Sequence, residues 1–185
     1  LQSLRVYFCE WKHMRCILFR HGIAVEWYHW NGEDKERPLT EEGVKKTQKI
    51  ALGLLQLQVH PTQLLCSPFT RTQQTATILQ QALAFPGDLQ LCPELLSEAS
   101  PENFVALLSS FSRNDTILCV GHQPHLGYAA GIMICGQPVP SLSLKRAGAC
   151  SLFFEGTPRA GGGILEWWVP PSHLQRLSDQ ADKDE

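Results

Sequence analysis

Three features are scarce or missing in this sequence: an excess of one charge, a long uninterrupted apolar run, and a closely spaced cysteine pair. The net charge is −2 over 185 residues, without a basic block, so electrostatics give no support to nucleic-acid binding. The most apolar window, residues 117–135, is interrupted by glycine, histidine and proline, which argues against a transmembrane helix. Residues 1–13 mix charged and aromatic side chains, so we expect no secretory signal there.

Cysteine usage argues against a disulfide framework and against a zinc site. The count of seven is odd, no C-x-x-C spacing occurs, and most of these residues lie in apolar segments. This pattern is typical of reduced, buried thiols in a cytoplasmic protein. The cysteines are Cys9, Cys16, Cys66, Cys92, Cys119, Cys135 and Cys150.

Size and composition predict one globular domain. Hydrophobic residues make up 43 % of the chain and charged residues 18 %, which excludes overall disorder. We expect the domain to span residues 14–170, followed by a C-terminal helix or tail over 171–185 that is frayed from Ser178 onward. For residues 1–13 three interpretations stay open: residues added for expression, a wrongly assigned start, or an edge strand near Leu4–Phe8.

Strands and helices are predicted to alternate along the chain. Short apolar segments predict strands, and capping residues followed by helical spacing predict helices. A glycine-rich turn at 161–163 joins the last two strands into a predicted hairpin. The alternation favours a three-layer α/β/α sandwich. The predicted strands are 16–19, 63–66, 89–92, 116–120, 150–154 and 164–169, and the helices follow Thr40, Thr70, Ser100 and Pro124.

Polar, phosphate-competent residues follow three of these predicted strands. Arg20 and His21 follow the first, Arg71 follows the second, and His122 follows the strand at 116–120. If these strands are parallel neighbours, their ends open on one edge of the sheet and form a cationic pocket. Arginine suits phosphate oxygens, and histidine can act as a nucleophile or base. The pattern predicts an oxyanion site, to which helix N-termini would add amide groups.

The same residues carry a resemblance to a known family. The matching stretches are Arg20-His21-Gly22, Arg37-Pro38-Leu39-Thr40 with Gly43, Ser67-Pro68-x-x-Arg71-x-x-x-Thr75-Ala76, and Gly121-His122. Together they resemble the histidine phosphatase superfamily, which has the phosphoglycerate mutase-like fold, over residues 14–170. The short chain without a large insertion is most similar to the SixA-type phosphohistidine phosphatases. The resemblance implies a mostly parallel central sheet.

The resemblance also implies a mechanism. His21 would take the phosphoryl group as a covalent phosphohistidine, and water would then release phosphate. Arg20, Arg71 and His122 would bind the phosphoryl oxygens, where charge is spread in the transition state. No metal and no cofactor is implied.

The acid that would protonate the leaving group is left open. Glu98, in Leu96-Ser97-Glu98, resembles the family's Leu-x-Glu pattern, and Glu94 is the second candidate. Both could equally be solvated residues without a role. A phosphohistidine substrate needs the acid less, because imidazole leaves more easily than an alkoxide. Arg37 could bind the phosphate or anchor its loop.

Several further residues have two open interpretations. Lys145 and Arg146 could form a basic rim for a phosphoprotein or a solvated turn. His125, one helical turn after His122, could face the pocket or pack elsewhere. Trp27 and Tyr28 could line a substrate cleft or pack on the loop surface.

We therefore predict a cytoplasmic, metal-independent phosphatase of phosphohistidine on a protein, such as a histidine-containing phosphotransfer domain. Its partners would be the phosphorylated protein and the product phosphate, without nucleic acid or membrane. A phosphatase of small esters, such as sugar or nucleotide phosphates, is the alternative enzyme. A non-catalytic phosphate- or phosphoprotein-binding module on the same fold is the alternative from another class.

Overall fold

The computed structural model describes residues 13–184. Residues 1–12, and with them the possible edge strand near residues 4–8, lie outside the described part. Six strands alternate with five α-helices and short 3-10 turns. The elements are β1 (Met14–Arg20), η1 (Trp27–His29), η2 (Asp34–Glu36), α1 (Glu41–Gln56), β2 (Gln63–Cys66), α2 (Thr70–Ala82), β3 (Leu89–Leu91), η3 (Pro93–Leu95), α3 (Pro101–Leu107), η4 (Leu108–Ser110), β4 (Thr116–Gly121), α4 (His125–Cys135), β5 (Ala149–Phe154), β6 (Ile164–Val169) and α5 (Pro171–Asp184).

The strands form one mixed sheet in the order β3-β2-β4-β1-β5-β6. The first four strands in this order are parallel to their neighbours. β5 pairs antiparallel with β1, and β6 pairs antiparallel with β5. The predicted hairpin and the predicted mostly parallel α/β sandwich are therefore confirmed. β2, β4 and β1 are adjacent, so their carboxyl ends open on one edge of the sheet.

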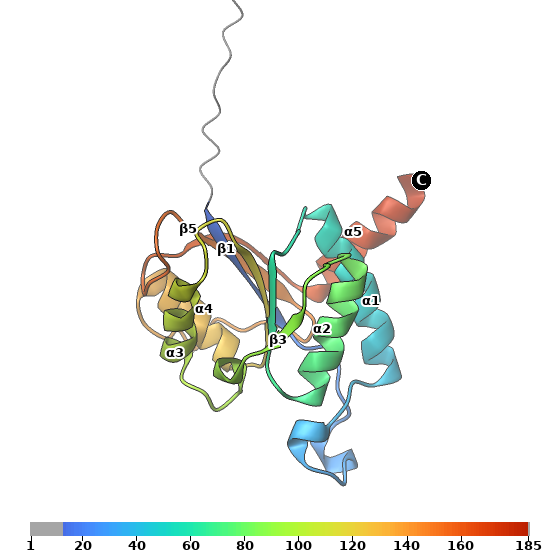
Figure 1. The fold of residues 1–185 in the computed structure, drawn as a ribbon. Helices are drawn as coiled ribbons and strands as arrows, with labels where there is room; N and C mark the ends of the chain where they lie inside the picture. The colour runs from blue at the N-terminus through green and yellow to red at the C-terminus, as the bar shows by residue number, and fades with distance from the viewer. Residues whose placement is uncertain (1–12, 185) are drawn as a thin grey trace, which may run out of the picture.

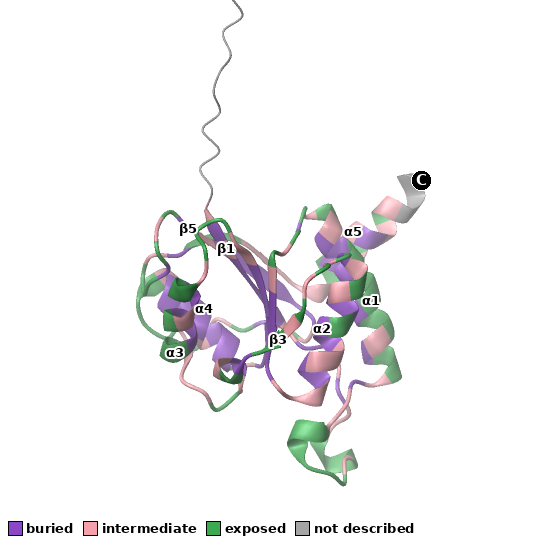
Figure 2. Ribbon diagram, in the orientation of Figure 1, coloured by how far each residue is buried: buried purple, intermediate pink, exposed green. Residues whose placement is uncertain are grey.

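Helices cover both faces of the sheet, with α3 and α4 on one side and α1, α2 and α5 on the other (Figure 1). Successive side chains of β1 point to opposite faces. Leu18 packs in the core beneath α3 and α4, whereas Ile17 and Phe19 pack in the core beneath α1 and α2. All three are fully buried. The four inner strands β1, β2, β4 and β5 are largely buried, as expected for a sheet covered on both faces, whereas the edge strands β3 and β6 are partly exposed (Figure 2).

The helix starts follow from local capping. The Thr40 hydroxyl accepts a hydrogen bond from the Gly43 amide at α1, and the Ser100 hydroxyl accepts one from the Asn103 amide at α3. Each cap satisfies an amide that has no partner inside its helix. Gly43 is required by close packing, because a Cβ there would collide with the Ile23 carbonyl oxygen.

The C-terminal segment differs from the prediction. The polar tail expected from Ser178 onward continues instead as α5, which reaches Asp184. Leu174 and Ser178, four residues apart, are both buried, and α5 packs along α1. This one buried face stabilises a helix whose other residues are mostly polar. None of the helices in the described part combines the length and the apolar character needed to cross a bilayer.

Candidate active site

His21 stands directly after β1, at the edge where the parallel strands end. Its amide donates a hydrogen bond to the Gly121 carbonyl at 3.1 Å, which continues the pairing of β1 with β4. The next amide, that of Gly22, donates to the Thr75 hydroxyl of α2 at 3.1 Å. A Cβ at Gly22 would collide with the Thr47 hydroxyl of α1. The nucleophile candidate is therefore held by the sheet and by two helices.

The His21 ring is poised as a neutral nucleophile. Nδ1 lies 2.8 Å from the Gly22 carbonyl oxygen, which can only accept, so Nδ1 carries the proton. In the neutral ring Nε2 then keeps its lone pair. The side chain is 7 % exposed. Burial, helped by the nearby charges of Arg71 and Arg20, lowers the pKa of His21 to about 3 despite the opposing hydrogen bond to Gly22.

His122 lies beside His21, after the neighbouring strand β4. The two ring centroids are 5.2 Å apart in an edge-to-face arrangement. Nε2 of His122 is 2.9 Å from the buried Ser67 hydroxyl, which follows β2. Burial is the main cause that lowers the pKa of His122 to about 2, and the charges of His21 and Arg71 act in the same direction. Both rings are therefore uncharged at neutral pH.

Arg71, in the first turn of α2, is buried and is held by a residue of the loop before α1. Its two terminal nitrogens donate to the Asp34 carbonyl oxygen at 2.8 Å and to Asp34 Oδ2 at 2.9 Å. The guanidinium carbon lies 4.8 Å from the centre of the Phe69 ring. Nε of Arg71 is buried and has no hydrogen-bond partner in the protein. One edge of the guanidinium is thus fixed by Asp34, and the Nε edge is left to bind an anion.

Arg20 brings a second guanidinium to the same strand end. One terminal nitrogen donates to the Leu144 carbonyl at 2.8 Å, while Nε is buried without a partner. Burial lowers its pKa first, and the charge of Arg146 lowers it further. Two arginines with unsatisfied donors, beside two histidines, make this edge suited to an oxyanion.

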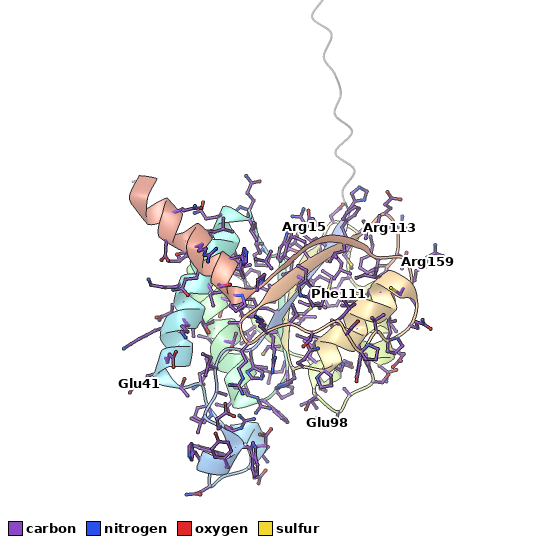
Figure 3. All side chains as sticks on the ribbon, turned by 180° about the vertical axis from the view of Figure 1, so that it is seen from behind. Arg15, Glu41, Glu98, Phe111, Arg113 and Arg159 are labelled. Atoms are coloured by element: carbon purple, nitrogen blue, oxygen red, sulfur yellow. The ribbon has the colours of Figure 1, made fainter. Side chains whose placement is uncertain are left out.

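The two acidic candidates differ in what they contact. Glu94 accepts a hydrogen bond from the Cys92 thiol at 3.3 Å, so its carboxylate is turned toward the protein. Glu98 is exposed and accepts from the Ser97 hydroxyl at 2.8 Å. Its charge contributes to the pKa of Arg71. Figure 3 shows Glu98 at the end of the molecule opposite Arg15, which lies near the start of β1. Of the two, Glu98 is the one whose charge acts on Arg71.

Two residues with open interpretations are occupied by other contacts. Arg37 donates from Nε to Asp34 Oδ1 at 2.9 Å and from a terminal nitrogen to the Val25 carbonyl at 2.6 Å. These are the contacts of a loop anchor. His125 is 1 % exposed, with its ring centroid 6.0 Å from that of Phe104. Burial is the first cause that lowers its pKa, so His125 is a packed residue and not a solvent-facing one.

The sequence correctly predicted which strand ends form the site. It did not predict the contacts that hold the candidate site residues in place. Asp34 pairs with both Arg71 and Arg37, and these pairs hold the pKa of Asp34 below its usual range against the opposing effect of burial. Ser67 contacts His122 and Thr75 contacts Gly22. The only available signal for Asp34 was its spacing of three residues from Arg37.

The arrangement can perform phosphoryl transfer. A phosphoryl group placed at Nε2 of His21 would find an uncharged nucleophile, two arginines and the imidazole of His122 around its oxygens. Within the described residues, no group of three or more histidine, cysteine, aspartate or glutamate side chains is arranged to hold a metal ion.

Comparisons with known proteins identify the family of this chain. The profile of the histidine phosphatase superfamily (branch 1) matches residues 16–97. An uncharacterized protein of Picosynechococcus sp. is 38 % identical over 141 residues, which are 75 % of this chain and 84 % of that protein. The chain therefore belongs to the histidine phosphatase superfamily, a class of phosphatases.

Within the superfamily, the similarity is with SixA-type members. The phosphohistidine phosphatase SixA of Escherichia coli is 26 % identical over 168 residues, which are 88 % of this chain and 97 % of that protein. The solved structure of the protein histidine phosphatase SixA complexed with tungstate superimposes with a TM-score of 0.75 at 25 % identity. That superposition covers 87 % of this chain and 99 % of the other.

Proposed function

We propose that this phosphatase removes the phosphoryl group from phosphohistidine on a protein, through a covalent intermediate on His21. The observation that carries the proposal is the state of His21: a buried ring with its proton on Nδ1, held by the Gly22 carbonyl, and with Nε2 free. Similarity to SixA proteins supports the choice of substrate. The roles assigned to individual residues belong to this proposal.

The first step transfers the phosphoryl group to the protein. Nε2 of His21 donates its lone pair to phosphorus as the bond to the substrate nitrogen breaks, and the departing imidazole takes a proton from solvent. Arg20, Arg71 and His122 hold the three phosphoryl oxygens, whose charge is spread in a loose transition state. The Gly22 carbonyl stabilises the positive charge that develops on the phosphorylated ring.

The second step regenerates the protein. A water molecule attacks phosphorus, the bond to Nε2 breaks, and the electron pair returns to the His21 ring. The proton lost by the water leaves to solvent or to phosphate. Because the ring keeps its Nδ1 proton throughout, it departs as a neutral imidazole, which is a good leaving group.

The position of Glu98 favours phosphohistidine over an ester. An alkoxide leaving group needs a proton from a positioned acid, whereas an imidazole does not depend on one to the same extent. Glu98 is exposed, and the hydrogen bond that its carboxylate accepts comes from its neighbour Ser97. Small phosphate esters are the second candidate, favoured by the electrostatic influence of Glu98 on Arg71.

The substrate test compares phosphate release from a phosphohistidine-bearing protein with release from an aryl phosphate, in the presence of chelator. We expect preferential turnover of phosphohistidine, loss of turnover in His21→Ala, and no effect of chelator. Preference for esters together with dependence on Glu98 would move the assignment to a small-molecule phosphatase. Phosphate binding without any turnover would leave the non-catalytic binding module.

A cytoplasmic location and a phosphorylated protein partner, such as a histidine-containing phosphotransfer domain, belong to the same proposal. Six cysteines are described and all are free thiols, which supports a reducing compartment.

A further inference from the structure

A second concave site lies next to Arg20, on the face of the sheet covered by α1 and α5. It has a volume of about 470 Å³ and is lined by four cationic side chains, those of Arg20, Lys46, Lys145 and Arg146. Thr47 of α1 and Ser172 and Gln175 of α5 add polar groups, while the other lining residues are apolar. His21, Arg71 and His122 do not line it, whereas Arg20 does, so this basic pocket adjoins the phosphoryl site and shares Arg20 with it.

Charge in the basic pocket is only partly compensated. Arg146 pairs with Glu26 at 2.7 Å, and Lys46 pairs with Glu42 on the same helix. Both pairs are between well-exposed side chains and are therefore weak. Lys145 has no ion pair within residues 13–184, and Arg20 donates only to a backbone carbonyl. No carboxylate lines the pocket, so it attracts an anion even though the protein as a whole carries −2.

The basic pocket opens at the same sheet edge as the nucleophile. Arg20 immediately precedes His21, and the Ala147 amide donates to the carbonyl oxygens of both residues. Arg20 and Arg146 lie close enough to His21 for their charges to act on its pKa. β5 is antiparallel to β1 and β6 is antiparallel to β5, so β6 ends at this edge and α5 begins there. Pro171 and Ser172, in the first turn of α5, line the pocket and bring the positive end of the helix dipole beside it.

We propose that the basic pocket binds carboxylate side chains of the phosphoprotein substrate, at positions that flank the phosphohistidine engaged by His21. This inference rests on the proposed function, which supplies the protein substrate. A segment that presents its phosphohistidine to His21 carries its neighbouring side chains past Arg20. Aspartate or glutamate one helical turn away lies about 5–6 Å from the phosphorylated residue, measured between Cβ atoms, and so faces the surface beside His21, where Arg20 lines the basic pocket.

Lys46 and Lys145 of the basic pocket select among substrates, while Arg20, which the pocket shares with the phosphoryl site, binds the phosphoryl group. The size of the pocket accommodates more than one carboxylate, since pockets of roughly 300–1,000 Å³ hold whole small ligands. Exposed lysines bind carboxylates as point charges, so recognition is electrostatic and salt-sensitive. A small molecule with a second anionic group would meet the same chemistry, and the experiment below separates the two sources.

The test uses two synthetic phosphohistidine peptides that differ only at the flanking positions, aspartate and glutamate in one, asparagine and glutamine in the other. We expect wild type to hydrolyse the acidic peptide with a kcat/KM about tenfold higher, through a lower KM. The Lys46→Gln/Lys145→Gln variant should lose this preference, and added salt should reduce it in wild type. Lys45→Gln is the matched control, because Lys45 is an exposed neighbour on α1 that does not line the pocket.

A binding measurement separates failure of this inference from failure of the proposed function. The unphosphorylated acidic peptide is labelled and its binding is followed by fluorescence anisotropy, which needs no turnover. Binding to wild type that is about tenfold weaker in the double variant supports the pocket even if phosphohistidine is not hydrolysed. Equal binding of the acidic and neutral peptides overturns the inference. A third outcome is that the double variant loses activity only toward a carboxylate-bearing aryl phosphate and acts on both peptides as wild type does. That result assigns the pocket to a small-molecule substrate and also overturns the inference.

Discussion

The phosphoryl centre and its rim are built in opposite ways. His21, His122 and Arg71 are 7 %, 2 % and 4 % exposed. Each is fixed by a hydrogen bond, His21 to the carbonyl of the adjacent Gly22, His122 to Ser67 and Arg71 to Asp34. The rim, by which we mean the loop between β1 and α1 together with Lys145 and Arg146, is largely exposed: in the loop, Trp27 and Tyr28 are 73 % and 62 % exposed, and its two short turns η1 and η2 project from the body of the protein (Figure 2).

We infer from this difference that the buried centre determines the chemistry and that the exposed rim determines the choice of substrate. Charge stabilisation depends on donors held in place before the reaction, and burial strengthens them by excluding water. An exposed rim can contact a partner's surface without reorganising the centre. Changes in the centre should therefore affect every substrate alike, whereas changes in the rim should affect one substrate relative to another.

Among the residues proposed to bind phosphate, Arg71 should give the largest loss of activity when its donors are removed. Arg71→Met keeps the length of the side chain but removes the donors, and we expect kcat/KM to fall about 10²–10³-fold for phosphohistidine and aryl phosphate alike. Steady-state kinetics on both substrates provides the measurement. Arg113→Met is the control, since Arg113 contacts Thr157 on an exposed surface. Unequal losses for the two substrates would contradict a common phosphoryl centre.

Asp34 tests whether the loop contributes to the centre by positioning. Asp34→Asn keeps the shape of the side chain and weakens its charged pairs with Arg71 and Arg37. We expect kcat/KM to fall about tenfold, mainly through kcat, with the phosphate affinity of Arg71 less affected. Glu36→Gln, on the same 3-10 turn, is the matched control. An unchanged kcat would mean that α2 alone orients Arg71.

The buried histidines predict how stability depends on pH. The folded pKa values of His21 and His122 are about 3 and about 2, whereas an unfolded histidine titrates near 6.5. Between these limits the unfolded state binds more protons, so the free energy of unfolding decreases as pH falls. Each histidine contributes a slope of up to about 1.4 kcal/mol per pH unit.

Urea unfolding measured between pH 7 and pH 4 checks this slope. His122→Asn should unfold with a shallower pH dependence than wild type, although its stability at pH 7 also changes. His60→Asn should keep the wild-type slope, because His60 is exposed. Equal slopes in wild type and His122→Asn would mean that His122 is charged in the folded protein.

Glu98 should give the smallest effect on the proposed substrate. Glu98→Gln removes the proton donor, and we expect less than about a threefold change in kcat for phosphohistidine, against about 10²-fold or more for an alkyl phosphate. The ratio of the two effects is the quantity to measure. Glu94→Gln, whose carboxylate contacts Cys92, is the control. A large loss on phosphohistidine would make Glu98 part of the centre.

The sequence predicted the centre because its signals are local. Apolar runs followed directly by Arg20-His21, Arg71 and His122 mark strand ends, and the resemblance ordered the strands. Asp34 escaped prediction because loop geometry has no periodicity, and its partner Arg71 lies 37 residues away along the chain. The tail prediction at Ser178 was wrong for a different reason. The buried face of α5 consists of few side chains, among them Leu174 and Ser178. The polar composition of the segment therefore predicted a tail, although the four-residue spacing of these two side chains is typical of a helix.

The proposed mechanism requires a covalent phosphoryl group on His21. The decisive measurement mixes protein with phosphohistidine substrate, quenches on the millisecond scale under alkaline conditions that preserve phosphohistidine, and locates the modification by peptide mass spectrometry. We predict a phosphorylated peptide containing His21 that appears before free phosphate, decays with it, and is absent from His21→Ala. Turnover without this species in wild type, or turnover retained in His21→Ala to more than about one part in 10⁴, would contradict the account.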